Sequence, residues 1–145
     1  MKQIALLATM ACCGLLVACG RQKVPYATAG DADLRIEVTP LRAEKDGSIR
    51  SFRVRLTPDG KIAAGLTHAA GESLNYRMDS CFYSGTGRNK ERATLVQAVA
   101  AGTNHSYEYL LVFDGRETVG DSTTLTYQDK YINHKTYTLK IAATR

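Results

Sequence analysis

The chain has 145 residues, a net charge of +5 and four cysteines. This length is enough for one domain with its own hydrophobic core. The basic excess is small and spread along the chain. It fits a protein that is soluble near an anionic membrane surface and argues against a nucleic-acid-binding protein.

Residues 1–18 have the pattern of a secretory signal peptide. A short basic start, Met1-Lys2-Gln3, precedes an apolar run that ends in small residues. This pattern is typical of a cleaved signal, and the run is shorter than the roughly 20 apolar residues that span a bilayer. We expect residues 1–18 to be removed, together with Cys12 and Cys13.

Leu16-Val17-Ala18-Cys19 resembles the lipobox of bacterial lipoproteins. The resemblance implies cleavage before Cys19, a diacylglycerol on its sulfur and often an acyl group on the new amino terminus. Two or three acyl chains hold a protein stably on a membrane. Gly20 follows the cysteine, and in this family that residue implies transfer to the outer membrane where the organism has one. An ordinary signal peptide, with Cys19 as a structural thiol, is the alternative.

Residues 19–32 are predicted to be the lipidated cysteine and a tether, and residues 33–145 a single domain. The stretch from Gly20 to Ala32 has no apolar period and would reach at most ~40 Å when extended. Once Cys19 is lipidated, Cys81 is the only remaining thiol, so we expect no internal disulfide.

Apolar and polar residues alternate in the first half of the domain, which predicts β-strands. One such strand is Leu34 to Val38, and another is Phe52 to Leu56. The segment between them contains Lys45-Asp46-Gly47, which we interpret as a three-residue hairpin loop. That loop pairs Val38 with Val54 and Glu37 with Arg55, so apolar residues share one face of the sheet.

The rest of the domain continues as short strands and turns. Thr57 to Gly60 is predicted to be a turn and residues 84–92 an exposed loop, while residues 62–73 remain ambiguous. Residues 91–101 could form a helix, but their Val and Thr content argues against it. Strands are predicted at 76–83, 94–100, 107–113, 123–127 and 136–142, with 107–113 central.

About seven strands at these spacings predict a single antiparallel β-sandwich. The order of elements loosely resembles the immunoglobulin-like domains of some small envelope lipoproteins. The Cys–Trp–Cys pattern of true immunoglobulins is missing, since the chain contains no Trp. The resemblance therefore concerns architecture and assigns no functional residues.

No cofactor or metal is expected. The three histidines, His68, His105 and His134, are 37 and 29 residues apart, without the close spacing of zinc ligands. Cys81 lies between polar residues and Phe82 in a strand pattern, where a free thiol usually behaves as a small buried hydrophobe. A reactive thiol and an intermolecular disulfide are the alternatives for Cys81.

Two groups of residues are candidates for a partner surface. Tyr127 and Tyr131 flank a polar segment at a strand end. The arginines of the first hairpin could form a basic patch, although Glu37 dilutes it and a solvated sheet face is the favoured interpretation. These arginines are Arg35, Arg53 and Arg55.

The sequence thus predicts a non-enzymatic, lipid-anchored envelope protein that binds an envelope protein or glycan. One alternative is a small envelope enzyme or redox-active lipoprotein that uses Cys81 or the histidines. Another is a structural or stress-protective lipoprotein without a specific ligand.

Overall fold

The computed structural model describes residues 27–41, 49–103, 105–115 and 122–142, with backbone only for residues 100–103. These residues form two antiparallel sheets, as the sequence predicts. The predicted lipobox at Cys19 and the Lys45-Asp46-Gly47 loop lie outside the described residues. Among those that are described, no helix has the length and hydrophobicity needed to cross a membrane.

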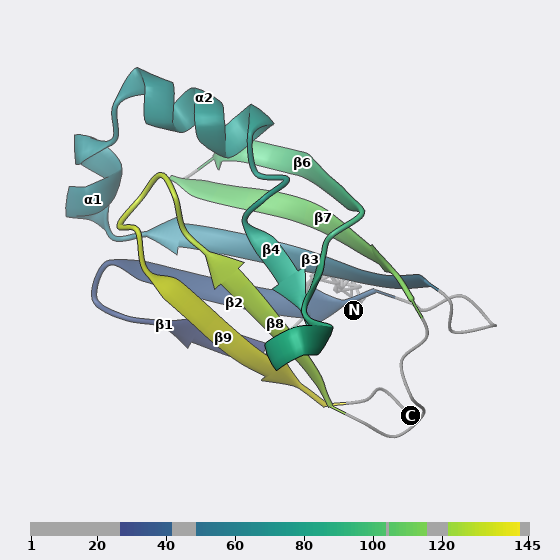
Figure 1. Cartoon of the computed structure of the whole chain (residues 1–145). Coiled ribbons are helices and arrows are strands. Elements are labelled where there is room, and N and C mark those ends of the chain that lie inside the picture. The colour runs from purple at the N-terminus through teal and green to yellow at the C-terminus, as the bar shows by residue number, and fades with distance from the viewer. Residues whose placement is uncertain (1–26, 42–48, 104, 116–121, 143–145) are drawn as a thin grey trace, which may run out of the picture.

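The first sheet has the strand order β1-β2-β3-β7-β6, and the second has the order β5-β4-β8-β9. Figure 1 shows the two sheets packed face to face, with α1 and α2 at one end. The strands are β1 (Ala27–Gly30), β2 (Leu34–Pro40), β3 (Ile49–Pro58), β4 (Phe82–Ser84), β5 (Glu91–Arg92), β6 (Leu95–Thr103), β7 (Ser106–Asp114), β8 (Thr123–Gln128) and β9 (Thr136–Ile141). The helices are α1 (Gly60–Gly65), α2 (His68–Tyr76) and the 3₁₀ turn η1 (Gly87–Asn89).

This order is that of an immunoglobulin-like sandwich. In that fold, strands A-B-E-D form one sheet and C-F-G the other. Here β2-β3-β7-β6 and β4-β8-β9 take those places, with β1 and β5 added at sheet edges. The helices α1 and α2 lie in the crossover from β3 to β4. The predicted fold class is confirmed.

The first hairpin has the predicted register. Val38 faces Val54 and Glu37 faces Arg55. Alternate residues of β2 and β3 are therefore buried between the sheets, and the residues between them point outward. The predicted inner residues of β9 are also buried, namely Tyr137, Leu139 and Ile141.

Aromatic rings occupy the centre of the sandwich, where an immunoglobulin carries a Trp packed on a disulfide. Phe82 on β4 stacks on Tyr127 of β8, with ring centroids 5.0 Å apart, and lies 5.7 Å from Tyr109 of β7. Cys81 is a free buried thiol next to this cluster. Packing among the rings of Phe82, Tyr109 and Tyr127 thus occupies the position that the disulfide takes in an immunoglobulin.

The structure settles one ambiguous segment and corrects two predictions. The ambiguous residues 62–73 fall in the helices α1 and α2 and the link between them, and the N-caps of these helices are Asp59 and Thr67. Tyr76 closes α2, so the strand predicted for residues 76–83 shrinks to β4. The domain also begins before residue 33, because β1 pairs with β2 along its whole length.

The sandwich has two ends, which we name by what they contain. The loop end holds the β1–β2 turn and the β8–β9 loop, joined by Lys135, whose ammonium contacts Asp31 and Asp33. The entry end holds the first residue of β3 and the last residue of β7, which pair as Ile49 and Asp114. Strand β1 runs toward the loop end, so the chain enters the sandwich from the entry end.

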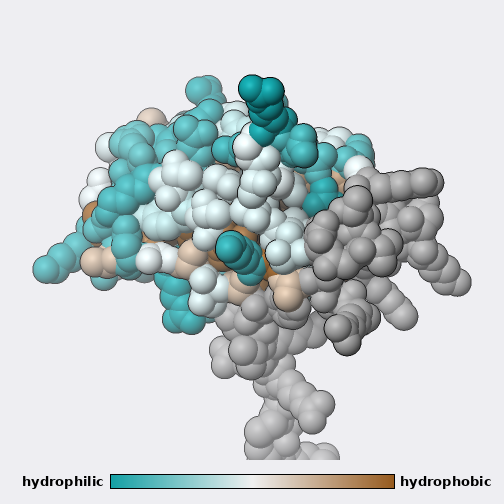
Figure 2. Space-filling view, turned by 60° about the horizontal axis from the view of Figure 1, so that its bottom comes forward, coloured by the Kyte–Doolittle hydropathy of each residue, from teal (hydrophilic) through white to brown (hydrophobic). Residues whose placement is uncertain are grey.

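The lower side of the molecule in Figure 1 is mainly polar. Figure 2 brings this side forward, and hydrophobic colour is confined to small areas among its described residues. Strand β9 exposes Thr136, Thr138 and Lys140 at alternate positions. The exposed large hydrophobic residues of the described chain lie elsewhere, at Tyr76, Leu95 and Val99.

Candidate binding site at the loop end

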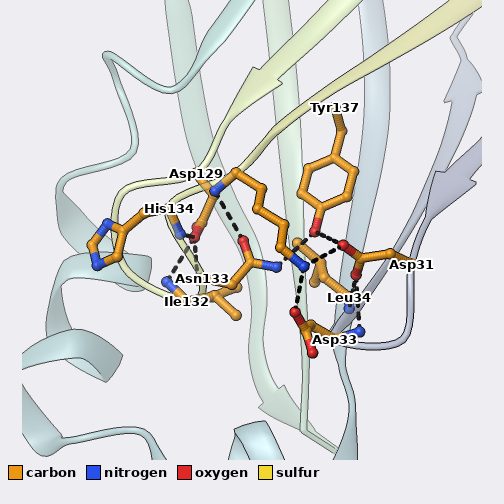
Figure 3. Close-up of polar contacts among 9 residues, drawn as sticks. Asp31, Asp33, Leu34, Asp129, Ile132, Asn133, His134 and Tyr137 are labelled. Atoms are coloured by element: carbon orange, nitrogen blue, oxygen red, sulfur yellow. Dashed lines mark hydrogen bonds and ion pairs between the residues drawn. The ribbon is translucent and has the colours of Figure 1, made fainter.

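The β8–β9 loop is folded around the carboxylate of Asp129, which is 3% exposed. Tyr127 donates its hydroxyl to this carboxylate at 2.6 Å. Four successive backbone N–H groups of the loop also donate to it, as Figure 3 shows in part. They belong to Tyr131 (3.3 Å), Ile132 (2.9 Å), Asn133 (2.5 Å) and His134 (2.7 Å).

These donors keep Asp129 ionised inside the domain. Burial acts to raise the pKa of Asp129, but the hydrogen bonds from Tyr127 and the loop backbone outweigh it and lower the pKa. Burial, and then the neighbouring Asp129, raise the pKa of Tyr127. The pair is therefore a fixed acceptor and donor that order the loop, and neither group exchanges protons near neutral pH.

A second polar cluster joins this loop to the β1–β2 turn. The Lys135 ammonium lies 2.7 Å from Asp31 and 2.6 Å from Asp33. Tyr137 donates its hydroxyl to Asp31 at 3.1 Å and accepts a hydrogen bond from the Asn133 amide at 2.7 Å. Figure 3 shows the two clusters side by side, with Asn133 between them.

The close charges of this cluster also shift the pKa values of Asp31 and Lys135. Lys135, with help from the Asp33 backbone, lowers the pKa of Asp31 to about 2. Asp31 and then Asp33 raise the pKa of Lys135. All three groups are partly exposed, so solvent screens their attraction and their main effect is to fix geometry.

The other side of the loop contacts the end of α2. Tyr131 donates its hydroxyl to the backbone oxygen of Arg77 at 3.0 Å. Lys130 donates to the Ser80 hydroxyl at 2.6 Å. Tyr76 precedes Arg77 and is 81% exposed. We call the group Tyr76, Arg77 and Tyr131 the distal surface.

The predicted arginine patch lies on the outer face of the first sheet, but acids accompany two of its members. Arg35 lies 2.8 Å from Glu37. Arg55 bonds Glu108 and lies 4.0 Å from Glu37. Arg53 faces Thr39 across the β2–β3 pair. This mixture of charges is that of a solvated sheet face.

Tyr127 cannot be part of a partner surface, because it is fully buried beneath the loop. Its position at the end of β8 points its ring into the core, while the next turn of the loop carries Tyr131 outward. Tyr131 is half-buried and belongs to the distal surface. Tyr76 and Arg77 are not recognisable from the sequence pattern, which predicts a strand at residues 76–83. Asp129 could have been recognised, because an Asp directly after a strand is a common organiser of loop N–H groups.

The residues of the enzyme alternative lie on separate elements. His68, His105 and His134 are exposed and lie on α2, the β6–β7 turn and the β8–β9 loop respectively. His68 lies 3.9 Å from Glu72 on the exposed side of α2. Cys81 is fully buried, and this burial raises the pKa of its thiol to about 11. No group of three or more potential metal ligands occurs in the described part of the chain.

No known protein family matches this chain, and neither a curated protein nor a solved structure matches it.

Proposed function

We propose that this protein is a non-enzymatic, lipid-anchored envelope lipoprotein whose sandwich binds another envelope component through the distal surface. Cys19 carries the acyl chains, and Gly20 directs the protein to the outer membrane where one exists. The lipobox supports the anchor. The position of the distal surface, at the end of the sandwich opposite to the chain entry, supports the binding role.

The chemistry of the distal surface favours a protein or glycan partner. Tyr and Arg are the residue types enriched at binding hot spots, because each offers a large contact area with a polar end. Tyr131 is held by its hydrogen bond to the Arg77 backbone and by the Asp129 loop. A surface ordered before binding loses less conformational entropy when the partner docks.

The anchor is tested by mass spectrometry of the mature protein from its native membrane. We expect an N-terminal Cys19 that carries two or three acyl chains. Cys19→Ser should abolish the acylation and leave the protein uncleaved or released. An unmodified amino terminus at any other residue contradicts the anchor.

The binding surface is tested by site-specific photo-crosslinking in intact cells. A photoreactive amino acid at position 76 should form a discrete adduct, and Arg77→Glu should abolish it. The matched control places the same amino acid at Thr138, an exposed position on β9. Equal adducts from both positions, or an adduct at position 76 that survives Arg77→Glu, would contradict the binding role.

A further inference from the structure

The hairpin formed by β4 and β5 projects at the entry end of the sandwich. Ser84 pairs with Leu125, and the Gly85 N–H donates to the Thr124 carbonyl at 2.9 Å, near the start of β8. Arg50, the second residue of β3, donates to the Ser84 hydroxyl at 2.8 Å. Figure 1 shows η1, at the tip of this hairpin, toward the end where β9 terminates and away from the β8–β9 loop.

Contacts between Arg50 and the hairpin hold it to the sandwich, and one of them involves Glu91, the single acidic residue of the hairpin. Arg50 forms an ion pair with Glu91 and lies over the Phe113 ring, 5.7 Å from the centroid. The Arg50 side chain is only 13% exposed, so this ion pair is partly shielded from water. Glu91, the one acid of the hairpin, therefore neutralises a residue of the sandwich. Among the described residues, no ion pair joins an acid to the basic residues of the hairpin.

Three basic residues remain, and all are exposed: Arg88, Lys90 and Arg92. Lys90 lies over the ring of Tyr83, 4.3 Å from its centroid. The tip depends on glycine, because Gly85 has φ +88° and a Cβ there would lie 2.4 Å from the Asn89 carbonyl oxygen. We call residues 82–92 with these three cations the basic hairpin.

We propose that the basic hairpin contacts the anionic phospholipid headgroups of the membrane that holds the acylated Cys19. This inference rests on the proposed anchor. Cys19 lies eight residues before Ala27, a span of at most ~28 Å. The entry end therefore stays close to the membrane, where basic side chains are attracted to anionic lipids.

Two points of attachment can hold the sandwich in one orientation on the membrane, whereas a single anchor leaves it free to turn. The acyl chains hold the start of the chain, and the basic hairpin adds an electrostatic contact on the second sheet, away from β1. Together they would hold the entry end on the membrane and turn the distal surface outward. An acyl anchor combined with a basic patch is a common way to bind a membrane.

The test uses the full lipidated protein in vesicles, with a fluorophore on Thr86→Cys at the tip of the basic hairpin. Thr86 is exposed and its side chain makes no cap hydrogen bond. Cys81 is buried, so the introduced thiol is labelled selectively. Quenching by acrylamide, which is uncharged, reports how freely water reaches the probe. Vesicles of phosphatidylcholine alone are compared with vesicles in which about a third of the lipid is phosphatidylglycerol.

We expect quenching to fall about twofold or more on the anionic vesicles and to recover in about 1 M salt, where the Debye length shrinks to about 3 Å. Arg88→Glu with Lys90→Glu should abolish the difference, whereas Arg88→Lys should keep it. A probe on Lys61→Cys, in α1 at the loop end, should show the same quenching on both vesicles. Lys61 is exposed.

Equal quenching of the Thr86→Cys probe on both vesicles would overturn the role of the basic hairpin while leaving the anchor intact. The role of the basic hairpin would also be overturned if the difference in quenching between the two vesicles survived the double charge reversal. A probe on Lys61→Cys that showed the same difference would overturn it as well. Flotation with phosphatidylcholine vesicles tests the anchor separately. A protein that fails to float would refute the anchor, and this proposal with it.

Discussion

The hydroxyl of Tyr127 donates to the carboxylate of Asp129 at 2.6 Å, and both side chains are buried. Tyr127 also stacks on Phe82 in the centre of the sandwich. This pair therefore connects the aromatic core to the loop that carries Tyr131. The order of the candidate binding surface depends on packing inside the domain.

Replacement of Tyr127 by Phe should test this connection. The ring remains, but the buried carboxylate loses one charge-assisted hydrogen bond, for which we expect a loss of about 1.5–3 kcal/mol in the free energy of unfolding. The measurement is urea unfolding of the chain from Gly20 to Arg145. Tyr76→Phe, at an 81% exposed position, is the matched control and should change the stability by less than about 0.5 kcal/mol. Equal effects would contradict the connection.

Asp129 should also make the free energy of unfolding depend on pH in the acidic range. Its pKa is lowered in the folded protein, so ionised Asp129 stabilises the fold above the unfolded pKa of about 3.9. This contribution is lost as the pH falls from about 5 through the folded pKa. Asp129→Asn should be less stable at neutral pH, and the difference from wild type should shrink below about pH 4. Urea unfolding at a series of pH values tests this, and a constant difference would refute it.

The closing strand offers a direct test of the sandwich. Leu139 is 2% exposed, while its neighbour Lys140 points outward. Leu139→Ala should cost about 2–5 kcal/mol, the usual range for a buried Leu. Lys140→Ala should cost less than about 0.5 kcal/mol. Small and equal effects in urea unfolding would mean that β9 is not a packed strand.

The strands could be predicted because their signal is local. Alternation along β2 and β3 fixes which residues are buried, and a register one residue away would place Val38 and Val54 on opposite faces. β9 could be identified in the same way, because Leu139 belongs to an alternating pattern of buried and exposed residues. The order of strands in each sheet depends on pairing between distant segments, which local alternation does not reveal. The observed order nevertheless agrees with the resemblance to immunoglobulin-like domains.

The helices and the distal surface were harder to predict. Residues 60–76 are small and rich in Gly and Ala, so an apolar period is weak there and α1 buries none of its residues. Their N-caps, Asp59 and Thr67, were present in the sequence, but Asp59 follows a Pro and reads equally well as a turn residue. Tyr76 could be recognised as a surface residue only once α2 was placed.

Lys135 should determine the acidity of Asp31. Its ammonium is the main cause of the Asp31 pKa of about 2. Lys135→Gln should therefore raise the pKa of Asp31 toward the unperturbed value of about 3.9. Carboxyl carbon shifts followed by NMR during an acid titration measure this. Lys140→Gln removes an equal charge from the exposed face of β9 and should leave Asp31 unchanged. An unchanged Asp31 pKa in Lys135→Gln would refute the assignment.

Cys81 should behave as an inert core thiol. It is fully buried, and burial raises its pKa to about 11, so at neutral pH it is protonated as well as shielded. Since the thiolate is the reactive form, an impermeant maleimide should label native Cys81 far more slowly than the urea-unfolded chain. Thr86→Cys, at an exposed position, provides the internal standard, because its thiol should label rapidly in the folded protein. Rapid labelling of native Cys81 would mean that the core opens around the Phe82 cluster, and it would favour the redox alternative over a binding protein.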